Sequence, residues 1–143
     1  MNTELSYESC RELLGSAVVG RVAICTPTGP TIVPVNFAVQ GESLVIRTSP
    51  YSALGTYGPN ARLAFEIDHL DHEYHTGWSV VAVGRAEVVS SSAELDQVRL
   101  EADPQPWAGG NRHLYLRLAW DDLTGRKIGA GWPHGQSPVK RVL

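Results

Sequence analysis

Three β-rich runs in the first half of the chain follow one another with only short turns between them. The runs are Gly20–Thr26, Thr31–Val39 and Ser43–Thr48, and each is dominated by β-branched and apolar residues. The turns are Pro27–Pro30 and Gln40–Glu42. Parallel strands need a crossover of about a dozen residues or more, whereas antiparallel strands can be joined by a tight turn. The spacing therefore predicts a meander of antiparallel hairpins.

The second half of the chain predicts further strands. Arg62–Asp68 and His113–Trp120 alternate between apolar and polar residues, and Trp78–Ser90 is a longer β-branched run. Leu123–Ile128 either continues the strand before it or pairs with it, and Asp68–Gly77 is expected to be a polar loop. The total is six or seven strands, and closing them into a small barrel would remove exposed edges. The predicted fold class is mainly β with a few short helices.

Two residues inside the predicted strands have a special meaning. Pro34 lacks a backbone N–H and cannot donate to a strand ladder, so it indicates a sheet edge or a bulge at that point. Gly84 lies within a long strand, where glycine often marks a bulge or a close approach of another backbone.

Two or three short helices are predicted around the strands. Ser6 precedes Tyr7–Leu14 at the position of an N-cap, and a glycine follows the segment. Pro50–Tyr57 begins with a proline, which the first turn of a helix tolerates well. Ala93–Leu100 follows a run of serines that can cap it, whereas Glu101–Arg112 is rich in proline and glycine and is predicted to be a connector.

Length and charge limit the organisation and the partners of the chain. Its 143 residues suit one domain, with a core over about residues 10–130 and an extended tail over 129–143. The formal net charge is −3, from 12 basic and 15 acidic residues. A nucleic-acid partner is not expected, because such binding needs a basic face that replaces phosphate counterions.

The cysteines and the apolar runs predict a cytoplasmic protein without a membrane segment. Cys10 and Cys25 are too few for a disulfide-rich secreted scaffold, so both are expected to be buried free thiols. The first residues lack the apolar stretch of a signal peptide. No apolar run approaches the ~20 residues that cross a bilayer.

A histidine-rich segment allows two interpretations. His69, His72 and His75 recur beside several carboxylates, a combination that suits zinc or iron. The other interpretation is a hydrated hairpin loop, because a three-residue spacing aligns ligands poorly and the segment follows a strand. We expect the loop, and no metal site is predicted.

A candidate anion site lies where one predicted strand ends. Arg47, Thr48 and Ser49 combine a guanidinium with two hydroxyls, directly before the helix expected at Pro50. Arginine and free backbone amides bind anions well, although an arginine at a strand end is often only solvated.

Several short motifs along the chain occur in a characteristic order and spacing. They are GRVAI at Gly20–Ile24, VPVNF at Val33–Phe37, VIRTS at Val45–Ser49, AFEID at Ala64–Asp68, GWSVVAVGRAE at Gly77–Glu87 and LTGRKI at Leu123–Ile128. In this order they resemble the small, single-domain members of the pyridoxamine 5′-phosphate oxidase-like flavoproteins, over about residues 10–130. The resemblance implies a six-stranded antiparallel split β-barrel that forms a homodimer, with two flavin sites at the dimer interface.

The resemblance also implies which residues contact the flavin. Along the isoalloxazine ring they are Pro34, Val35 and Asn36. Around the phosphate they are Arg47, Thr48, Ser49 and Ser52. In the segments that approach the cleft from the other protomer or lie beside it they are Trp78, Ser79 and Arg126.

The implied cofactor is FMN, with the deazaflavin F420 as the alternative. Ala53 stands where the family usually has a lysine shortly after its Arg-Thr pair, and this departure keeps F420 open. The implied function is a flavin-dependent oxidoreductase acting on an unassigned small molecule, with the flavin carrying the redox step and no side chain assigned as catalytic. A non-catalytic module that holds a flavin or haem, and a dimeric barrel with a degenerate pocket, are the other two interpretations.

Overall fold

The structure is a computed structural model that describes residues 2–129, and over that range it has seven strands and three short helices. The strands are β1 (Asn2–Glu4), β2 (Val19–Thr26), β3 (Gly29–Gln40), β4 (Ser43–Thr48), β5 (Arg62–Asp71), β6 (Thr76–Val88) and β7 (Leu114–Ile128). The helices are α1 (Tyr7–Ser16), α2 (Ala53–Tyr57) and α3 (Ser92–Glu101).

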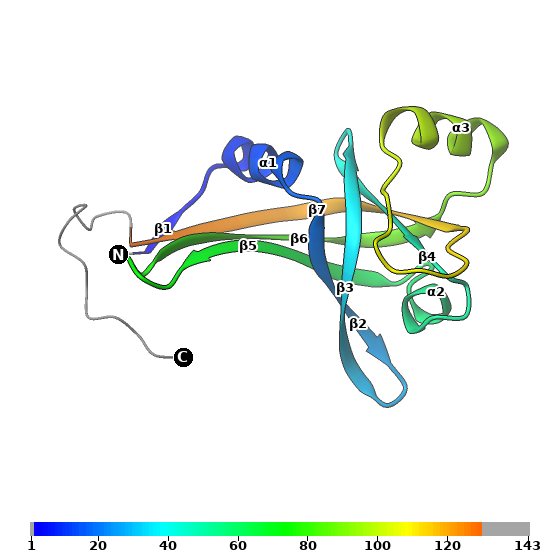
Figure 1. Cartoon of the computed structure of the whole chain (residues 1–143), viewed down its shortest axis with the longest axis horizontal. Helices are drawn as coiled ribbons and strands as arrows, with labels where there is room; N and C mark the ends of the chain where they lie inside the picture. Colours follow the sequence, from blue (N-terminus) through cyan, green and yellow to red (C-terminus); the bar gives the residue numbers. More distant parts are fainter. Residues whose placement is uncertain (1, 130–143) are drawn as a thin grey trace.

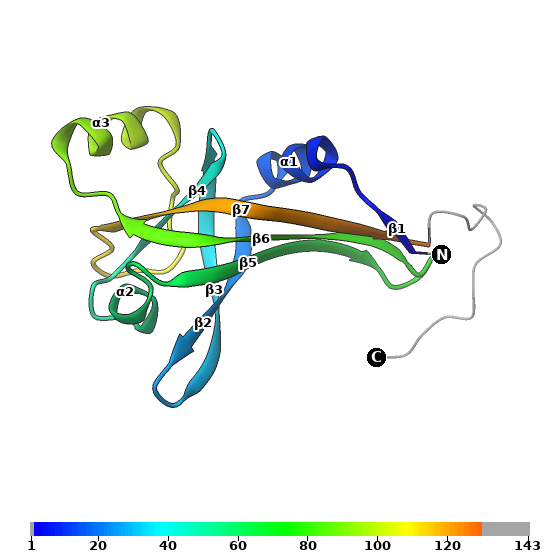
Figure 2. The same ribbon diagram turned by 180° about the vertical axis from the view of Figure 1, so that it is seen from behind.

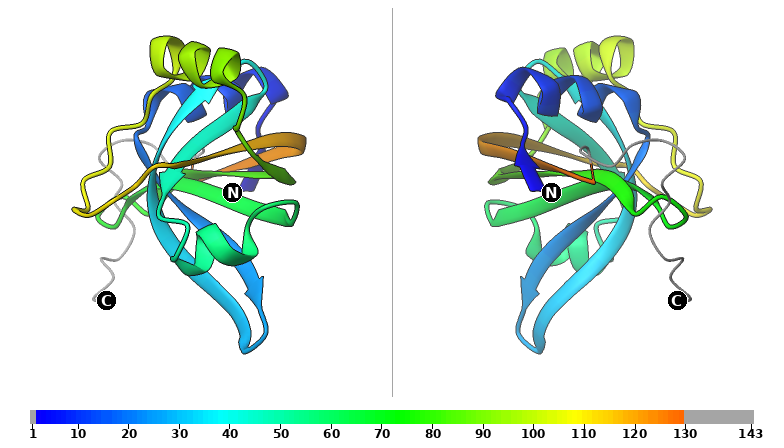
Figure 3. Two further views of the ribbon diagram at one scale, coloured as in Figure 1. Left: turned by 90° about the vertical axis from the view of Figure 1, so that its right-hand side faces the viewer. Right: turned by 90° about the vertical axis from the view of Figure 1, so that its left-hand side faces the viewer.

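The strands form one antiparallel sheet that closes on itself. Their order is β1-β7-β4-β3-β2-β5-β6, and a long pairing between β6 and β7 closes the ring. Figure 1 shows β5, β6 and β7 running along the molecule and crossing β2, β3 and β4, and the views in Figure 3 look along them. The predicted six-stranded antiparallel split barrel is confirmed. β1 adds a short seventh strand beside β7, which the sequence did not predict.

The three helices cover the barrel from two sides. α1 and α3 lie on one side of it and α2 lies on the other, as Figures 1 and 2 show from opposite directions. Ser6 is the N-cap of α1 and accepts a hydrogen bond from the backbone N–H of Ser9, and Ser91 caps α3 in the same way. The capping serines predicted for the first and last helices are therefore confirmed, because a serine hydroxyl satisfies a free N–H of the first turn.

Alternation along the strands builds much of the core, although β4 is buried on both faces. In β2, Val22 and Ile24 are buried whereas the residues beside them are exposed. Phe37 and Phe65 meet edge to face inside the barrel, with ring centroids 4.7 Å apart. Burying one such side chain contributes about 1.5–3 kcal/mol relative to leaving it exposed, so the inner face of the barrel supplies most of the stabilisation.

Pro34 lies on a sheet edge and not in a bulge. It pairs opposite Arg21 of β2 in a regular register. The N–H of Phe37 donates a hydrogen bond to the carbonyl of Val18, and this bond shows which residues of β3 are hydrogen-bonded toward β2. The backbone N–H and carbonyl groups of odd-numbered residues in β3 therefore point toward β2. Those of even-numbered residues such as Pro34 point toward the β4 side. The β3–β4 ladder comprises only residues 37–40, so the missing N–H of Pro34 removes no ladder bond.

Gly84 combines the two features that its position predicted. The β6–β7 register shifts between Val83 and Gly84, which is a β-bulge. A Cβ atom at Gly84 would lie 2.0 Å from the carbonyl oxygen of Ala119, so the two backbones approach more closely than any side chain would allow. The bulge thus depends on glycine.

Other predicted boundaries and environments need correction. The polar loop expected over Asp68–Gly77 is only residues 72–75, because β5 continues to Asp71 and pairs with Thr76. Leu123–Ile128 continues β7 as one strand. Cys10 is buried as expected, but Cys25 is exposed because it lies on the outward-facing side of β2. Most of the tail expected from residue 129 onward lies outside the described residues.

No helix within residues 2–129 has the length and apolar character needed to cross a bilayer.

Candidate functional site

A pocket of about 200 Å³ lies between β3, β4, α2 and the segment that follows α3. We call it the β3–β4 pocket, and its lining residues are Val33, Pro34, Val35, Asn36, Arg47, Thr48, Ser52, Ala53, Leu54, Pro106, Ala108 and Arg112. Six residues predicted to contact a flavin are among them: Pro34, Val35, Asn36, Arg47, Thr48 and Ser52. The structure thus brings together two groups that the sequence assigned to the ring and to the phosphate.

The wall formed by β3 offers backbone groups as well as side chains. Pro34 and Asn36 face the side of β3 that no strand covers at that point, within the part of the chain that the structure describes. The carbonyl of Pro34 and the N–H of Asn36 therefore have no ladder partner. The walls beside them carry the apolar side chains of Val33, Val35 and Leu54. An apolar pocket with a few fixed polar groups is typical of sites for flat organic ligands.

The two hydroxyls of the pocket are used within the protein. The Ser52 hydroxyl donates to the carbonyl of Ser49 at 2.7 Å and accepts from the N–H of Gly55 at 3.0 Å. Thr48 and Ser52 lie 2.8 Å apart, hydroxyl to hydroxyl. Because Ser52 has one proton and gives it to Ser49, the Thr48 hydroxyl is the donor of that pair. Ser52 is therefore the N-cap of α2, which begins at Ala53 and not at Pro50.

Ser49 lies next to the pocket without lining it. Its carbonyl accepts from Ser52, and its hydroxyl accepts from the N–H of Tyr51. In this conformation its polar groups stabilise the turn before α2.

Arg47 reaches from β4 to the segment after α3. Its guanidinium donates to Asp103 at 3.4 Å and to the carbonyls of Pro104 and Arg112, both at 3.3 Å. It also lies over the ring of Tyr115, 5.1 Å from the centroid. The positive charge of Arg47 is thus partly compensated, and the side chain holds the segment against the barrel.

Residues 102–113 form a loop between α3 and β7 that supplies one wall of the pocket, and we call it the pocket loop. Its second attachment is a hydrogen bond of 2.8 Å from the backbone N–H of Trp107 to Oδ1 of Asn36. The Trp107 side chain is 75% exposed. Sequence reasoning treated this segment as a connector and missed Trp107 and Arg112. No local pattern could have found them, because the contact joins residues that are 71 positions apart.

A second pocket, the β6–β7 pocket, contains two more of the predicted residues. It measures about 420 Å³ and is lined by Glu4, Ser79, Val81, Thr124, Gly125 and Arg126. Ser79 and Arg126 are register partners on β6 and β7. Glu4 of β1 lines this pocket, and Figure 1 shows β1 at the end of the molecule opposite α2 and the pocket loop. Within one chain the predicted residues are therefore divided between two distant sites.

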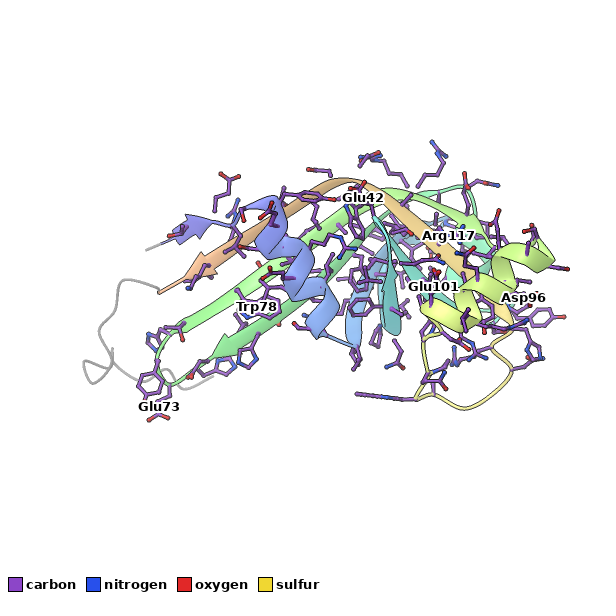
Figure 4. All side chains as sticks on the ribbon, turned by 90° about the horizontal axis from the view of Figure 1, so that it is seen from above. Glu42, Glu73, Trp78, Asp96, Glu101 and Arg117 are labelled. Carbon is purple, nitrogen blue, oxygen red and sulfur yellow. The ribbon has the colours of Figure 1, made fainter. Side chains whose placement is uncertain are left out.

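Trp78 lines neither of these two pockets. It is half-buried on β6, and its ring lies 6.4 Å from that of His69 on β5. Figure 4 shows Trp78 in the part of the molecule that carries α1, away from Arg117 and Glu101 beside α3. Its place is thus closer to the β6–β7 pocket end than to the β3–β4 pocket.

The histidines lie on the hairpin between β5 and β6. His69 is on β5, whereas His72 and His75 are in the turn, with His75 at a positive φ of 51°. Across residues 2–129, no group of three or more His, Cys, Asp or Glu residues is placed to hold a metal ion.

Comparison with known proteins gives one family. The family model described as pyridoxamine 5′-phosphate oxidase matches residues 6–127. A curated relative, an uncharacterised protein of Mycobacterium tuberculosis, is 29% identical over 130 residues, which cover 87% of this chain and 84% of the relative.

Solved structures share the same fold. The FAD-binding protein from Mycobacterium smegmatis is 30% identical with a TM-score of 0.74, over 87% of this chain and 97% of that chain. An FAD-binding protein from Mesorhizobium loti is 20% identical with a TM-score of 0.71, over 89% of this chain and 96% of that chain. At that identity the second similarity concerns the fold alone.

Proposed function

The chain belongs to the pyridoxamine 5′-phosphate oxidase family, and we propose that it binds a flavin nucleotide in the β3–β4 pocket as a flavin-dependent oxidoreductase. The observation that carries this proposal is the convergence of the residues implied for the flavin ring and phosphate on that one pocket. The FAD-binding relative from Mycobacterium smegmatis, similar over nearly its whole length, supports a flavin nucleotide as the ligand. FMN and FAD share the ring and the first phosphate, and both are included in the proposal.

The chemistry of the pocket fits such a ligand. The uncovered backbone groups of Pro34 and Asn36 suit the polar edge of an isoalloxazine ring, and Val33 and Val35 offer apolar contact to its face. Arg47 and Arg112 supply positive charge at the same site for a phosphate. When bound, a flavin supplies the redox chemistry, while the protein binds it, orients it and excludes water.

Among residues 2–129, the lining has no residue suited to proton transfer near neutral pH. It contains neither a carboxylate nor a histidine, cysteine, lysine or tyrosine side chain. Its residues therefore act by binding and positioning, and transfer of a hydride to a flavin does not require a protein acid or base. The same observation favours a second candidate function, a module that binds a flavin without turnover.

The division of the predicted residues between two pockets supports a homodimer. A two-fold arrangement would place the β6–β7 pocket end of one copy, with Ser79 and Arg126, against the β3–β4 pocket of the other. Each dimer would then have two equivalent sites. Free thiols at Cys10 and Cys25 support a reducing, cytoplasmic location for this dimer.

The test is ligand binding by the purified chain. FMN, FAD, F420 and haem are titrated separately, with absorbance, flavin fluorescence and native mass spectrometry as readouts. We expect FMN or FAD to bind at one molecule per protomer, and reduction of the bound flavin by a nicotinamide donor would distinguish the oxidoreductase from the binding module. Binding of F420 alone would replace the cofactor, and a chain that binds neither flavin nor F420 would refute the proposed function.

A further inference from the structure

The charges around the β3–β4 pocket are unequally compensated. Within the described part of the chain, the ionisable side chains in its lining are two arginines, Arg47 and Arg112. Arg47 forms an ion pair with Asp103 and donates to two carbonyls. Arg112 has no carboxylate partner within residues 2–129. The uncompensated positive charge of the pocket is therefore that of Arg112.

The backbone and one nitrogen of Arg112 are held in place by the pocket loop. Its carbonyl accepts a hydrogen bond from Nε of Arg47 at 3.3 Å, and its own Nε donates to the carbonyl of Ala108 at 3.3 Å. Neither Nη1 nor Nη2 of Arg112 makes a hydrogen bond to the described residues. A guanidinium oriented through Nε with both terminal nitrogens available presents the paired donors that suit a phosphate.

The other polar groups of the pocket cannot replace this charge. The hydroxyl protons of Thr48 and Ser52 are given to neighbouring oxygens, as described above. The Ala53 side chain, at the start of α2, adds no charge to the pocket. A phosphate that entered the pocket would thus find one unpaired cation among residues 2–129, and this cation comes from the pocket loop and not from β4 or α2.

We infer that Arg112 binds the phosphoryl group of the flavin nucleotide and is the main determinant of affinity for that group. The inference rests on the proposed function and assigns a residue outside the motifs that carry the family resemblance. Arg47 then acts as a positioning residue, because it holds the carbonyl of Arg112 and the carboxylate of Asp103 on the same loop.

The test compares flavins with and without phosphate. Riboflavin, FMN and FAD are titrated by fluorescence against the wild-type chain and against Arg112→Ala. We expect the variant to bind FMN about 10- to 100-fold more weakly, the range given by losing charged hydrogen bonds. Riboflavin should bind both proteins with the same affinity within about twofold, because it has no phosphate. A loss confined to FAD would place Arg112 at the second phosphate, which is still the phosphoryl role inferred.

Three further variants separate charge from loop structure. Arg112→Gln keeps a side-chain N–H that can reach the Ala108 carbonyl but removes the charge, so it should bind FMN as weakly as Arg112→Ala. Arg112→Lys keeps the charge and should restore part of the affinity. Arg85→Ala is the matched control, because Arg85 is exposed on β6 and contacts the carbonyl of Asn60, away from the pocket.

The outcomes distinguish this inference from the function it rests on. Wild-type protein that binds no flavin would refute the proposed function and the role of Arg112 with it. Wild-type protein that prefers FMN to riboflavin, together with an Arg112→Ala variant of unchanged preference, would overturn the role of Arg112 alone. A variant that loses riboflavin and FMN equally would also overturn it, because the residue would then only shape the loop.

Discussion

The side-chain oxygen of Asn36 accepts a hydrogen bond of 2.8 Å from the backbone N–H of Trp107. This bond ties the uncovered edge of β3 to the pocket loop, and the amide nitrogen of Asn36 donates in turn to the carbonyl of Val18, the residue before β2. Asn36 therefore joins two strands and the loop. The geometry of the β3–β4 pocket therefore depends on the two hydrogen bonds of the Asn36 side chain.

Replacing Asn36 by alanine should loosen the pocket loop without unfolding the barrel. The N–H of Trp107 would lose its partner, and we expect a local cost of about 0.5–1.5 kcal/mol because water can replace part of the bond. The measurement is amide hydrogen exchange, which should become faster at Trp107 while β6 and β7 stay protected. Asn111→Ala, an exposed change in the same loop, is the control, and equal protection in all three proteins would contradict the prediction.

Replacing Asp103 by asparagine should strengthen binding of a flavin nucleotide. The change removes the negative charge that compensates Arg47. The Tyr115 hydroxyl, which donates to Asp103 at 3.1 Å in the wild-type chain, can still donate to the asparagine oxygen. We expect FMN to bind about three- to tenfold more tightly, from one unit charge acting at a partly solvated distance. Asp96→Asn on α3 is the control, since Asp96 is exposed and lies outside the pocket, and weaker FMN binding by the Asp103 variant would argue against this electrostatic account.

Two variants that each weaken flavin binding should complement each other if the site is shared between protomers. Arg47→Ala affects the β3–β4 pocket and Arg126→Ala affects the β6–β7 pocket. After co-expression, half of the dimers would be mixed and each would contain one intact site, so roughly a quarter of all sites should bind flavin. Bound flavin is counted by absorbance after gel filtration. Absence of complementation would show that both arginines act within one chain.

Replacing Gly84 by alanine should destabilise the barrel by about 1–3 kcal/mol, the usual range for overpacking. The new methyl group would lie 2.0 Å from the Ala119 carbonyl oxygen, and the strands would have to separate at the bulge. Gly109→Ala is the matched control, because nothing lies within 4 Å of its added Cβ atom. Thermal unfolding of both variants measures the difference, and equal melting temperatures would refute the close approach.

Glu66 and Asp121 should influence the pH dependence of stability in opposite directions. Burial raises the pKa of Glu66 above its ordinary value of 4.5, and the neighbouring Asp68 adds to the effect, although Arg21 opposes it. The folded chain then binds more protons than the unfolded chain between the two pKa values, so stability falls as pH rises through that interval. Glu66→Gln should therefore gain stability relative to the wild type as pH rises above 4.5.

Asp121 provides the opposite case. Its two hydrogen bonds to Arg62, both 2.7 Å, lower the pKa of Asp121 below its ordinary 3.8. The stabilisation is present above pH 3.8 and disappears as pH falls through the lowered folded-state pKa. Asp121→Asn should lose stability relative to the wild type only above that range. Urea unfolding at a series of pH values checks both variants, and parallel curves for the two would contradict the assignment.

The strands that enclose the core could be predicted well because at least one face of each is largely buried. β4 was predicted to the residue, since its centre, Leu44–Ile46, is apolar and turn residues flank both ends. The end of β5 was predicted too early. From Asp68 onward both faces of the β5–β6 hairpin are largely polar. The sequence there has no apolar–polar alternation from which the paired strands could be predicted.

The predicted residues of the candidate site lie on two strand motifs, with Ser52 at the N-cap of α2. Pro34–Asn36 and Arg47–Thr48 lie on neighbouring strands, and the order of the motifs was enough to bring them together. The pocket loop has no periodic pattern, and tertiary contacts from Arg47 and Asn36 hold it in place. Arg112 and Trp107 therefore become visible only once the chain is folded.

The pocket loop contributes one wall of the site without pairing in the barrel ladders. The residues of the loop therefore need not follow the strand pattern of β3 and β4. They also need not preserve the pairing register that closes β6 on β7. Substitutions or insertions between α3 and β7 can alter the shape and charge of that wall while the scaffold continues to fold. Divergence among relatives of this barrel is therefore expected to concentrate in this loop, so that new ligand preferences can evolve through a short segment.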